Sequence, residues 1–329
     1  MYYCWLRLNF FLFVEQNRSM AESKVLPWSK SVDSKSADGP HKVSYRVWGE
    51  EHAEPEACVF CVHGLTGNST NFAYLAEYIT KTRNWRVVSV DIIGRGRSSW
   101  LPNKKLYKLS QYAYDVERLI EVINARIPTV PFFYVGVSMG GMIGMSLFSR
   151  ESESAKRFKG FVTVDIGPIL EQEYLTPLLT RVKHVDVFET PEKAAERVIA
   201  TYSATCGPTA DENFFRFLSS QALVYSEEHK GYIFNYDREG IVEGLYNEDG
   251  SLTVGCCDKW EKVAETLPVM VMWGVESTLL KESTIEYMQK THSGLEIARI
   301  EKTGHFPPLY ADEQNEIIAA WFDKLLGKK

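Results

Sequence analysis

The sequence contains no concentrated block of basic residues and no apolar run long enough to cross a bilayer. Of its 329 residues, 37 are Lys or Arg and 43 are Asp or Glu, so the net charge is −6. Proteins that bind nucleic acid carry basic patches that neutralise phosphates, and this composition therefore argues against a nucleic-acid partner. The apolar residues 10–14 are far fewer than the roughly 20 that a membrane helix needs, which argues against a membrane span.

Residues 1–19 also lack the parts of a secretory signal peptide. No basic stretch precedes the apolar run, and no small-x-small cleavage site follows it. The next stretch, residues 20–41, is rich in Ser, Lys and Asp, as is typical of a segment without a packed core. We expect residues 1–40 to form a flexible arm, and an N-terminal targeting segment is the alternative for residues 1–19.

The six cysteines form neither a disulfide framework nor a cluster of metal ligands. Cys58 and Cys61 have the spacing of a redox or zinc motif, but they lie in an apolar strand whose alternation points the two thiols to opposite faces. Cys256 and Cys257 are adjacent in a polar loop without an accompanying His or Cys cluster. We therefore expect reduced thiols, no bound metal and a cytoplasmic protein.

Apolar strands alternate with amphipathic helices along most of the chain. Residues 41–48 alternate as a half-exposed edge strand does, whereas residues 57–62 are continuously apolar, as in a strand covered on both faces. The predicted buried strands are 57–62, 86–93, 132–137, 158–166, 268–274 and 295–300, and the helical patterns are 68–84, 107–127, 139–148, 282–290 and 312–326. This order predicts an α/β fold with a mostly parallel sheet and helices on both faces.

Residues 169–265 interrupt this alternation with helical patterns and frequent aromatic residues. The sequence has no internal repeat that would explain the change. We therefore expect an α/β core formed by residues 41–168 and 266–329, with a helical insertion between its two parts.

Ser138 lies at a sharp junction between a strand and a helix. It is the centre of the G-x-S-x-G motif of residues 136–140, which follows the apolar strand 132–137 and opens an apolar helix. Side chains at Gly136 and Gly140 would collide with the neighbouring backbone in such a turn, which explains the two glycines. The turn exposes the serine hydroxyl beside the first N–H groups of the helix, so Ser138 is the candidate nucleophile.

A serine nucleophile needs a base, and His305 is the best placed of the seven histidines. It follows the last predicted strand on a rigid loop, after Gly304 and before two prolines. Active sites of parallel sheets gather outside the carboxyl ends of the strands. His305 and Ser138 can therefore meet at this edge although they are far apart in the sequence.

His63 is the competing base, because it also follows a strand. It precedes Gly64, however, and its expected role is to hold the loop so that the N–H of Leu65 faces the substrate. With the N–H of Met139, this donor would form an oxyanion hole, in which each donor contributes roughly 3 kcal/mol to the transition state. The glycine-rich residues 94–99 lack the G-K-S/T of a phosphate loop, so we expect no bound nucleotide.

Four motifs occur in an order and spacing seen in one known superfamily. They are His63-Gly64, the loop of residues 91–99, the G-x-S-x-G of residues 136–140, and Gly304-His305. In these motifs the chain resembles the α/β-hydrolase fold superfamily over residues 41–327. The resemblance implies an eight-stranded, mostly parallel sheet, a helical cap at residues 169–265 and no cofactor. We expect a small, ester-like substrate and a monomer or homodimer.

The acid that orients the histidine departs from the pattern of the superfamily. Many relatives carry it in a Gly-x-x-Asp turn after the strand equivalent to 268–273, but here that turn begins at Gly274 and has no aspartate. Two candidates remain: Asp165, which ends the preceding strand, and Glu276, one position short of the usual place. We favour Asp165, with Glu276 as the alternative acid, since either loop could reach His305.

These residues predict a serine hydrolase that cleaves a carboxylic ester or thioester. His305 would deprotonate Ser138, and an acyl-enzyme would form and then be hydrolysed by water. Hydrolysis of a carbon–carbon bond or a lactone would use the same residues, and the sequence does not separate these reactions. The missing Gly-x-x-Asp acid leaves a non-catalytic ligand receptor on the same fold as a further alternative.

Overall fold

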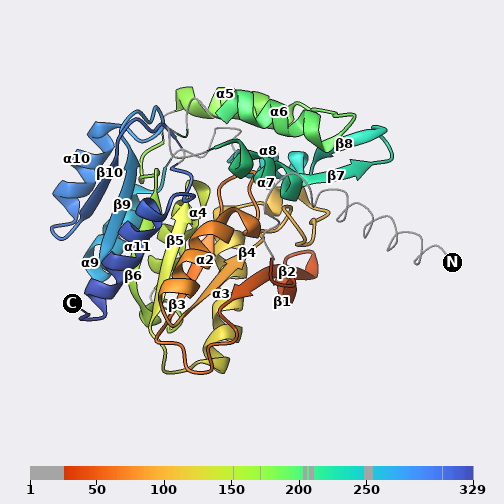
Figure 1. Ribbon diagram of the computed structural model, residues 1–329. Coiled ribbons are helices and arrows are strands. Elements are labelled where there is room, and N and C mark those ends of the chain that lie inside the picture. Colours follow the sequence, from red (N-terminus) through yellow and green to blue (C-terminus); the bar gives the residue numbers. More distant parts are fainter. Residues whose placement is uncertain are drawn as a thin grey trace.

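In the part of the chain that the structure describes, eight strands form one sheet (Figure 1). This computed structural model describes residues 26–150, 152–170, 172–202, 206, 211–247, 255–305 and 307–328. The strands are β1 (Lys30–Ser36), β2 (Gly39–Trp48), β3 (Ala57–Val62), β4 (Trp85–Val90), β5 (Phe132–Val137), β6 (Phe158–Val164), β9 (Val269–Gly274) and β10 (Glu296–Ile300). Their order is β1-β2-β4-β3-β5-β6-β9-β10, and every pairing from β4 to β10 is parallel. The predicted mostly parallel sheet is confirmed.

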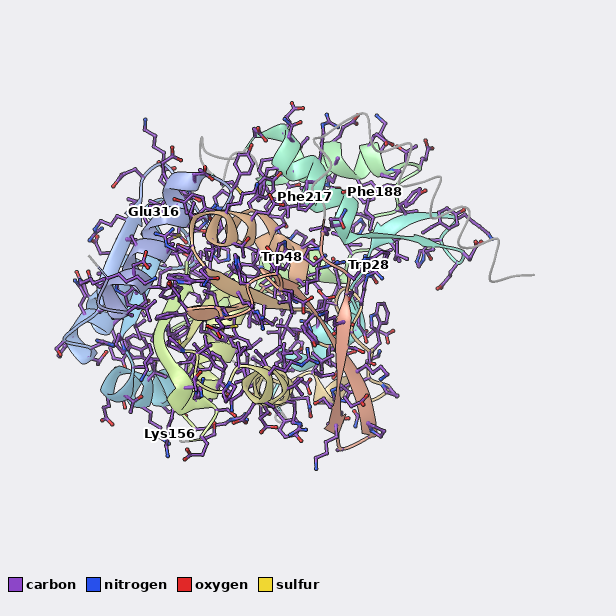
Figure 2. All side chains as sticks on the ribbon, turned by 60° about the horizontal axis from the view of Figure 1, so that its bottom comes forward. Trp28, Trp48, Lys156, Phe188, Phe217 and Glu316 are labelled. Atoms are coloured by element: carbon purple, nitrogen blue, oxygen red, sulfur yellow. The ribbon has the colours of Figure 1, made fainter. Side chains whose placement is uncertain are left out.

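Helices cover both faces of this sheet and bury two apolar clusters. The first cluster includes residues of α3 (Leu109–Arg126), α4 (Met139–Phe148), α9 (Cys257–Thr266) and α10 (Glu282–Thr291), and the second includes residues of α2 (Ala73–Thr82) and α11 (Asp312–Leu325). Figure 2 shows side chains filling the space between the layers, with Glu316 marking α11. The loops contain the short 3-10 turns η2 (Ser69–Phe72), η3 (Lys104–Leu106) and η4 (Ala155–Arg157). No helix within the described ranges combines the length and apolar character that crossing a bilayer requires.

The central strands are continuously apolar because both of their faces are covered. Every residue of β3 and of β5 is buried. Along β3, Cys58 and Phe60 enter the first apolar cluster, whereas Val59 and Cys61 enter the second. The prediction that Cys58 and Cys61 are buried on opposite faces is confirmed, and both thiols are free.

The prediction that residues 1–40 form a flexible arm is wrong for Lys30–Ser36, which form strand β1. Strand β1 pairs with β2 along its whole length, so this segment is part of the sheet. Its apolar residue is Val32, and its buried Ser34 donates a 2.6 Å hydrogen bond to the buried carboxylate of Asp115 on α3. A strand with so polar an inner face gives no hydrophobic periodicity that would reveal it. Residues 1–25 lie outside the described part of the chain.

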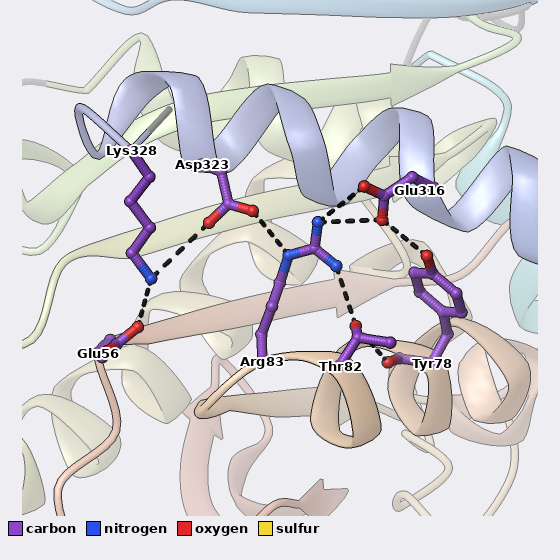
Figure 3. A network of polar contacts seen from close by, with 7 residues as sticks. All are labelled: Glu56, Tyr78, Thr82, Arg83, Glu316, Asp323 and Lys328. Carbon is purple, nitrogen blue, oxygen red and sulfur yellow. Dashed lines mark hydrogen bonds and ion pairs between the residues drawn. The ribbon is translucent and has the colours of Figure 1, made fainter.

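A polar network joins α2 to α11 at the outer surface of one helical layer (Figure 3). Arg83, which follows α2, donates from Nε to Asp323 at 2.8 Å and from Nη2 to Glu316 at 2.9 Å. Tyr78 donates to the same Glu316 at 2.7 Å, and Lys328 lies 3.7 Å from Asp323. The network therefore fixes the last helix against the helix that follows the first parallel strand.

The insertion lies over the carboxyl ends of the parallel strands (Figure 1). Its elements are α5 (Gln172–Lys183), α6 (Pro191–Tyr202), α7 (Glu212–Ala222), β7 (Leu223–Ser226), β8 (Gly231–Phe234) and α8 (Arg238–Gly244). The described insertion contains the β7–β8 hairpin in addition to the expected helices. Helix α9 begins inside the range expected for the insertion, but it packs against α4 and contributes to the first apolar cluster.

Candidate active site

Ser138 occupies a strained turn between β5 and α4. Its backbone φ is 50° and its ψ is −117°, a conformation whose strain is about 1–3 kcal/mol. The turn is tight because two glycines lack side chains. A Cβ at Gly136 would lie 2.5 Å from the carbonyl carbon of Gly140, and a Cβ at Gly140 would lie 2.7 Å from the carbonyl carbon of Val62 in β3. This geometry leaves Ser138 partly exposed at the carboxyl edge of the sheet.

His305 and Asp165 form a hydrogen-bonded pair at the same edge. Nδ1 of His305 lies 2.7 Å from Oδ2 of Asp165. The Asp165 side chain is 1% exposed and the His305 side chain 35% exposed, so a buried carboxylate anchors a ring that solvent still reaches. The contact favours a proton on Nδ1 of the neutral ring, which leaves Nε2 as the free basic nitrogen.

Asp165 is itself held by neighbouring donors. Its Oδ1 accepts a hydrogen bond from the backbone N–H of Gly274 at 2.9 Å, and its Oδ2 accepts one from Ser277 Oγ at 2.5 Å. Asp165 directly follows β6 and has a φ of 50°, a sharp turn that brings its carboxylate against the end of the neighbouring strand β9. With His305, these donors satisfy a carboxylate that is buried away from water.

The structure places Glu276, the alternative acid, differently. Its side chain is exposed, and its backbone N–H donates to the carbonyl of Thr303 at 2.9 Å. Ser277 occupies the third position after Gly274, where the Gly-x-x-Asp turn would carry its aspartate. Ser277 is a partner of the acid that the sequence analysis does not predict, although a serine at the vacant acid position indicates such a contact. Of the two candidate acids, Asp165 is the one that the fold brings to His305.

Both ring nitrogens of His63 are engaged by the loop that it begins. Nδ1 lies 2.7 Å from the carbonyl oxygen of Gly64 and donates to it, while Nε2 accepts from the N–H of Ile92 at 3.0 Å. Burial lowers the pKa of His63 to about 3, so the ring is neutral near pH 7. A Cβ at Gly64 would lie 3.5 Å from Cβ of Ser138, so this loop passes directly beside the serine.

A buried aspartate braces the loops beside the site. Asp91, which follows β4, accepts hydrogen bonds from the backbone N–H of Ser69 at 2.6 Å and of Arg97 at 3.0 Å. The first contact reaches the loop after β3, and the second holds the glycine-rich loop after β4. Gly96 permits this close packing, since a Cβ there would lie 2.5 Å from the carboxyl carbon of Asp91.

The insertion covers the loop that carries Leu65. The Leu65 side chain packs against an apolar cluster that includes Val182, Tyr236 and Ile241 of the insertion. The surface next to this loop is therefore apolar on the insertion side. The described residues contain no group of three or more His, Cys, Asp or Glu placed to hold a metal ion.

Helix α7 of the insertion contacts two loops of the site. The carbonyl of Gln221 near its end accepts from the side-chain amide of Asn68, on the loop after β3, at 3.1 Å. Asp211, which caps its beginning, accepts from the hydroxyl of Tyr310 at 2.8 Å. Tyr310 lies on the loop that carries His305, so one helix touches both loops.

Known proteins share this fold. Residues 58–312 match the alpha/beta hydrolase fold family, and the chain belongs to that family. A solved structure of an alpha/beta hydrolase from Novosphingobium aromaticivorans superposes with a TM-score of 0.73 at 24% identity, over 91% of this chain and 100% of that chain.

Relatives of this chain carry the names of hydrolases. The 3-hydroxybutyrate-oligomer hydrolase of Cupriavidus necator is 28% identical over 290 residues, which cover 87% of this chain and 94% of that protein. The sn-1-specific diacylglycerol lipase ABHD11 of Mus musculus is 30% identical over 175 residues, or 52% of this chain and 53% of that protein. Together with the family, these similarities support a hydrolase.

Proposed function

We propose that the protein is a serine hydrolase that cleaves a carboxylic ester or thioester through an acyl-enzyme on Ser138. The observation that carries the proposal is the 2.7 Å contact between Nδ1 of His305 and the buried carboxylate of Asp165. A histidine anchored in this way, on the sheet edge that also exposes a serine in a strained turn, supports the assignment of both as base and nucleophile of acyl transfer.

The reaction begins when Nε2 of His305 takes the proton of Ser138 Oγ, which attacks the carbonyl carbon of the substrate. The N–H groups of Leu65 and Met139 hold the negative oxygen of the tetrahedral intermediate. His305 then gives its proton to the leaving alcohol or thiol, and the acyl group stays on Ser138. Water, deprotonated by the same histidine, attacks the acyl carbon, and the histidine returns this proton to Ser138 Oγ as the acid is released, while Asp165 stabilises the charged ring.

The insertion acts as a cap that receives an apolar part of the substrate. Leu65, one of the proposed oxyanion donors, packs against apolar side chains of the insertion. Such a surface excludes water and favours an acyl or alcohol group with little charge. The names of two relatives, an oligomer hydrolase and a diacylglycerol lipase, are consistent with substrates of this kind.

Turnover of p-nitrophenyl esters of short and long acyl chains tests the proposal. We expect the wild type to release nitrophenol, and Ser138→Ala and His305→Ala to lose turnover while their circular dichroism spectra remain unchanged. A fluorophosphonate should label Ser138, and it should label no other serine of the protein. Label on a different serine, or a folded wild type that hydrolyses none of these esters, would contradict the proposal and favour a ligand receptor.

A further inference from the structure

Arg95, in the glycine-rich loop after β4, is a fully buried cation without a carboxylate partner among the residues that the structure describes. Its side chain donates from Nε to the carbonyl of Leu65 at 2.9 Å, and from Nη1 to the carbonyl of Ile93 at 2.8 Å and the hydroxyl of Tyr112 at 3.1 Å. Nη2 lies 3.7 Å from the sulfur of Met139. Arg95 is 0% exposed, and no carboxylate oxygen of the described residues lies within 4.0 Å of its nitrogens.

Stability alone does not account for this arrangement. Removing a guanidinium from water costs free energy, which a buried ion pair or a hydrophobic residue of similar volume would avoid or offset. Here the charge is compensated by two carbonyls, a hydroxyl and the ring of Tyr112, whose centroid is 5.1 Å away. What distinguishes the position is that the guanidinium contacts both residues whose N–H groups are the proposed oxyanion donors.

The contact with Leu65 helps to fix the direction of its N–H group. The peptide before Leu65 is held by His63, which donates to the carbonyl of Gly64, and the peptide after it is held by Arg95. With both flanking peptides hydrogen-bonded, the N–H of Leu65 has little freedom to rotate. On the opposite side of the site, Nη2 of Arg95 packs on the side chain of Met139, which begins helix α4.

The insertion keeps this charge away from solvent. The N–H of Asp237 donates to the carbonyl of Gly94 at 2.7 Å, and the side-chain amide of Asn235 donates to the carbonyl of Gly96 at 2.9 Å. Between them, Tyr236 forms an isolated β-bridge with Arg95. A positive charge enclosed in this way is weakly screened, so it acts strongly on a negative charge that forms nearby.

We propose that Arg95 is a positioning residue for the oxyanion hole. It orients the N–H of Leu65, supports Met139, and places a buried positive charge where negative charge develops on the substrate oxygen. It acts through these residues and does not itself contact the substrate. The inference rests on the proposed function, because it requires the oxyanion to form between Leu65 and Met139.

The test compares Arg95→Met, Arg95→Lys and the control Arg97→Met, which removes an exposed arginine two residues further along the same loop. kcat and KM for p-nitrophenyl butyrate and the inhibition constant of a trifluoromethyl ketone, which forms a tetrahedral adduct with serine, are measured for each. We expect Arg95→Met to lower kcat about 100-fold with little change in KM, and to weaken the ketone in parallel. Arg95→Lys should recover part of the loss, and Arg97→Met should match the wild type.

The inference is overturned if folded Arg95→Met keeps the kcat of Arg97→Met, or if only KM changes. If Arg95→Met does not fold, Arg95→Lys and Tyr112→Phe decide, because Tyr112→Phe removes one partner of the guanidinium and leaves the contacts to the donor residues. We then expect a lower kcat for Arg95→Lys and an unchanged kcat for Tyr112→Phe; equal values contradict the proposal. A wild type without turnover or fluorophosphonate labelling rejects the proposed function itself, whereas an active wild type with unaffected Arg95 variants rejects this inference alone.

Discussion

The hydroxyl of Ser277 donates to Oδ2 of Asp165 at 2.5 Å, the same oxygen that lies against Nδ1 of His305. Ser277 stands where a Gly-x-x-Asp turn would place its carboxylate, and the carboxylate comes instead from the neighbouring strand. Strands β6 and β9 are adjacent and parallel, with Val164 opposite Met272, so their carboxyl ends lie side by side. The acid therefore reaches the histidine from one strand away.

Replacing the buried acid should separate the two candidates. Asp165→Asn keeps the shape of the side chain but removes the charge that stabilises the protonated His305, so we expect kcat to fall by about four orders of magnitude. The exposed Glu276 makes the matched control, and Glu276→Gln should retain most of the activity. Ester turnover of the two variants, with circular dichroism to check folding, provides the comparison. The opposite result would assign the acid to the turn after β9.

Ser277→Ala should reduce activity to a smaller extent. The variant removes one charge-assisted hydrogen bond to Asp165 but leaves those from Gly274 and His305 in place. Such a bond contributes about 1.5–3 kcal/mol. A loss of about 1.4 kcal/mol of transition-state stabilisation lowers kcat tenfold, and this is the decrease that we expect. Thr278→Ala, at the exposed next position, is the control and should behave as wild type. Similar rates for the two variants would show that Ser277 does not position the acid.

The glycines around Ser138 should differ in their tolerance of a methyl group. A Cβ at Gly140 would overlap the backbone of Val62, which cannot move without disturbing the centre of the sheet, so Gly140→Ala should lower the free energy of unfolding by about 3 kcal/mol or more. At Gly64 the nearest atom to the new Cβ is 3.5 Å away, an ordinary contact, and Gly64→Ala should change stability by less than about 1 kcal/mol. Urea denaturation measures both values. Equal losses would mean that the turn is less tightly packed than described.

His63 should make folding stability depend on pH. Burial lowers the pKa of His63 to about 3 in the folded protein, whereas it is about 6.5 in an unfolded chain. Between these values the unfolded state binds the additional proton, so the contribution of His63 is complete above pH 6.5 and is lost as the pH falls toward 3. The slope is at most about 1.4 kcal/mol per pH unit.

Urea unfolding at pH 7.5, 6.0 and 4.5 tests this dependence in the wild type and in His63→Gln. Glutamine can still donate and accept hydrogen bonds but does not titrate. We expect the variant to be less stable at pH 7.5 and to lose less stability between pH 6.0 and 4.5 than the wild type does. Parallel curves for the two proteins would assign the acid sensitivity to other groups.

The network between α2 and α11 should contribute to stability and not to catalysis. Arg83 is 11% exposed and donates to both Asp323 and Glu316, so Arg83→Gln should lower the free energy of unfolding by about 1–2 kcal/mol. The solvent-exposed Lys81, which pairs with Glu77 at 3.4 Å, is the control, and Lys81→Gln should cost less than about 0.5 kcal/mol. Ester turnover should be unchanged in both. A loss of activity in Arg83→Gln would link this layer to the site.

Two strands and one helix with continuous apolar sequences could be predicted to the residue, whereas the bounds of β4, β6, β9 and β10 differ from the predicted ones by one to three residues. Strands β3 and β5 and helix α4 begin and end where the sequence placed them, because full burial leaves a run of apolar residues with clear ends. Ser138 and His305 were found at the predicted edge for the same reason, since both follow such strands. The fold and the location of the candidate site thus follow from hydrophobic pattern and glycine spacing.

The rest depends on contacts that no local pattern records. The polar strand β1 is held in the sheet by its pairing with β2 and by the hydrogen bond between Ser34 and Asp115. The choice between Asp165 and Glu276 depends on side-chain direction at two adjacent strand ends, which the sequence does not specify. Arg95 appears in the sequence as one more charged loop residue, and its burial follows only from the way the insertion folds over it.

The contact between Ser277 and Asp165 also bears on how such a site can change during evolution. Ser277 and Asp165, which follow two neighbouring strands, meet at the oxygen that contacts the imidazole of His305, so a chain with an aspartate at both positions would have two carboxylates beside the ring. The acid could therefore pass from one strand to the other by single substitutions, without an intermediate that lacks it. A chain without the Gly-x-x-Asp motif can therefore still place a carboxylate against this histidine, from the neighbouring strand.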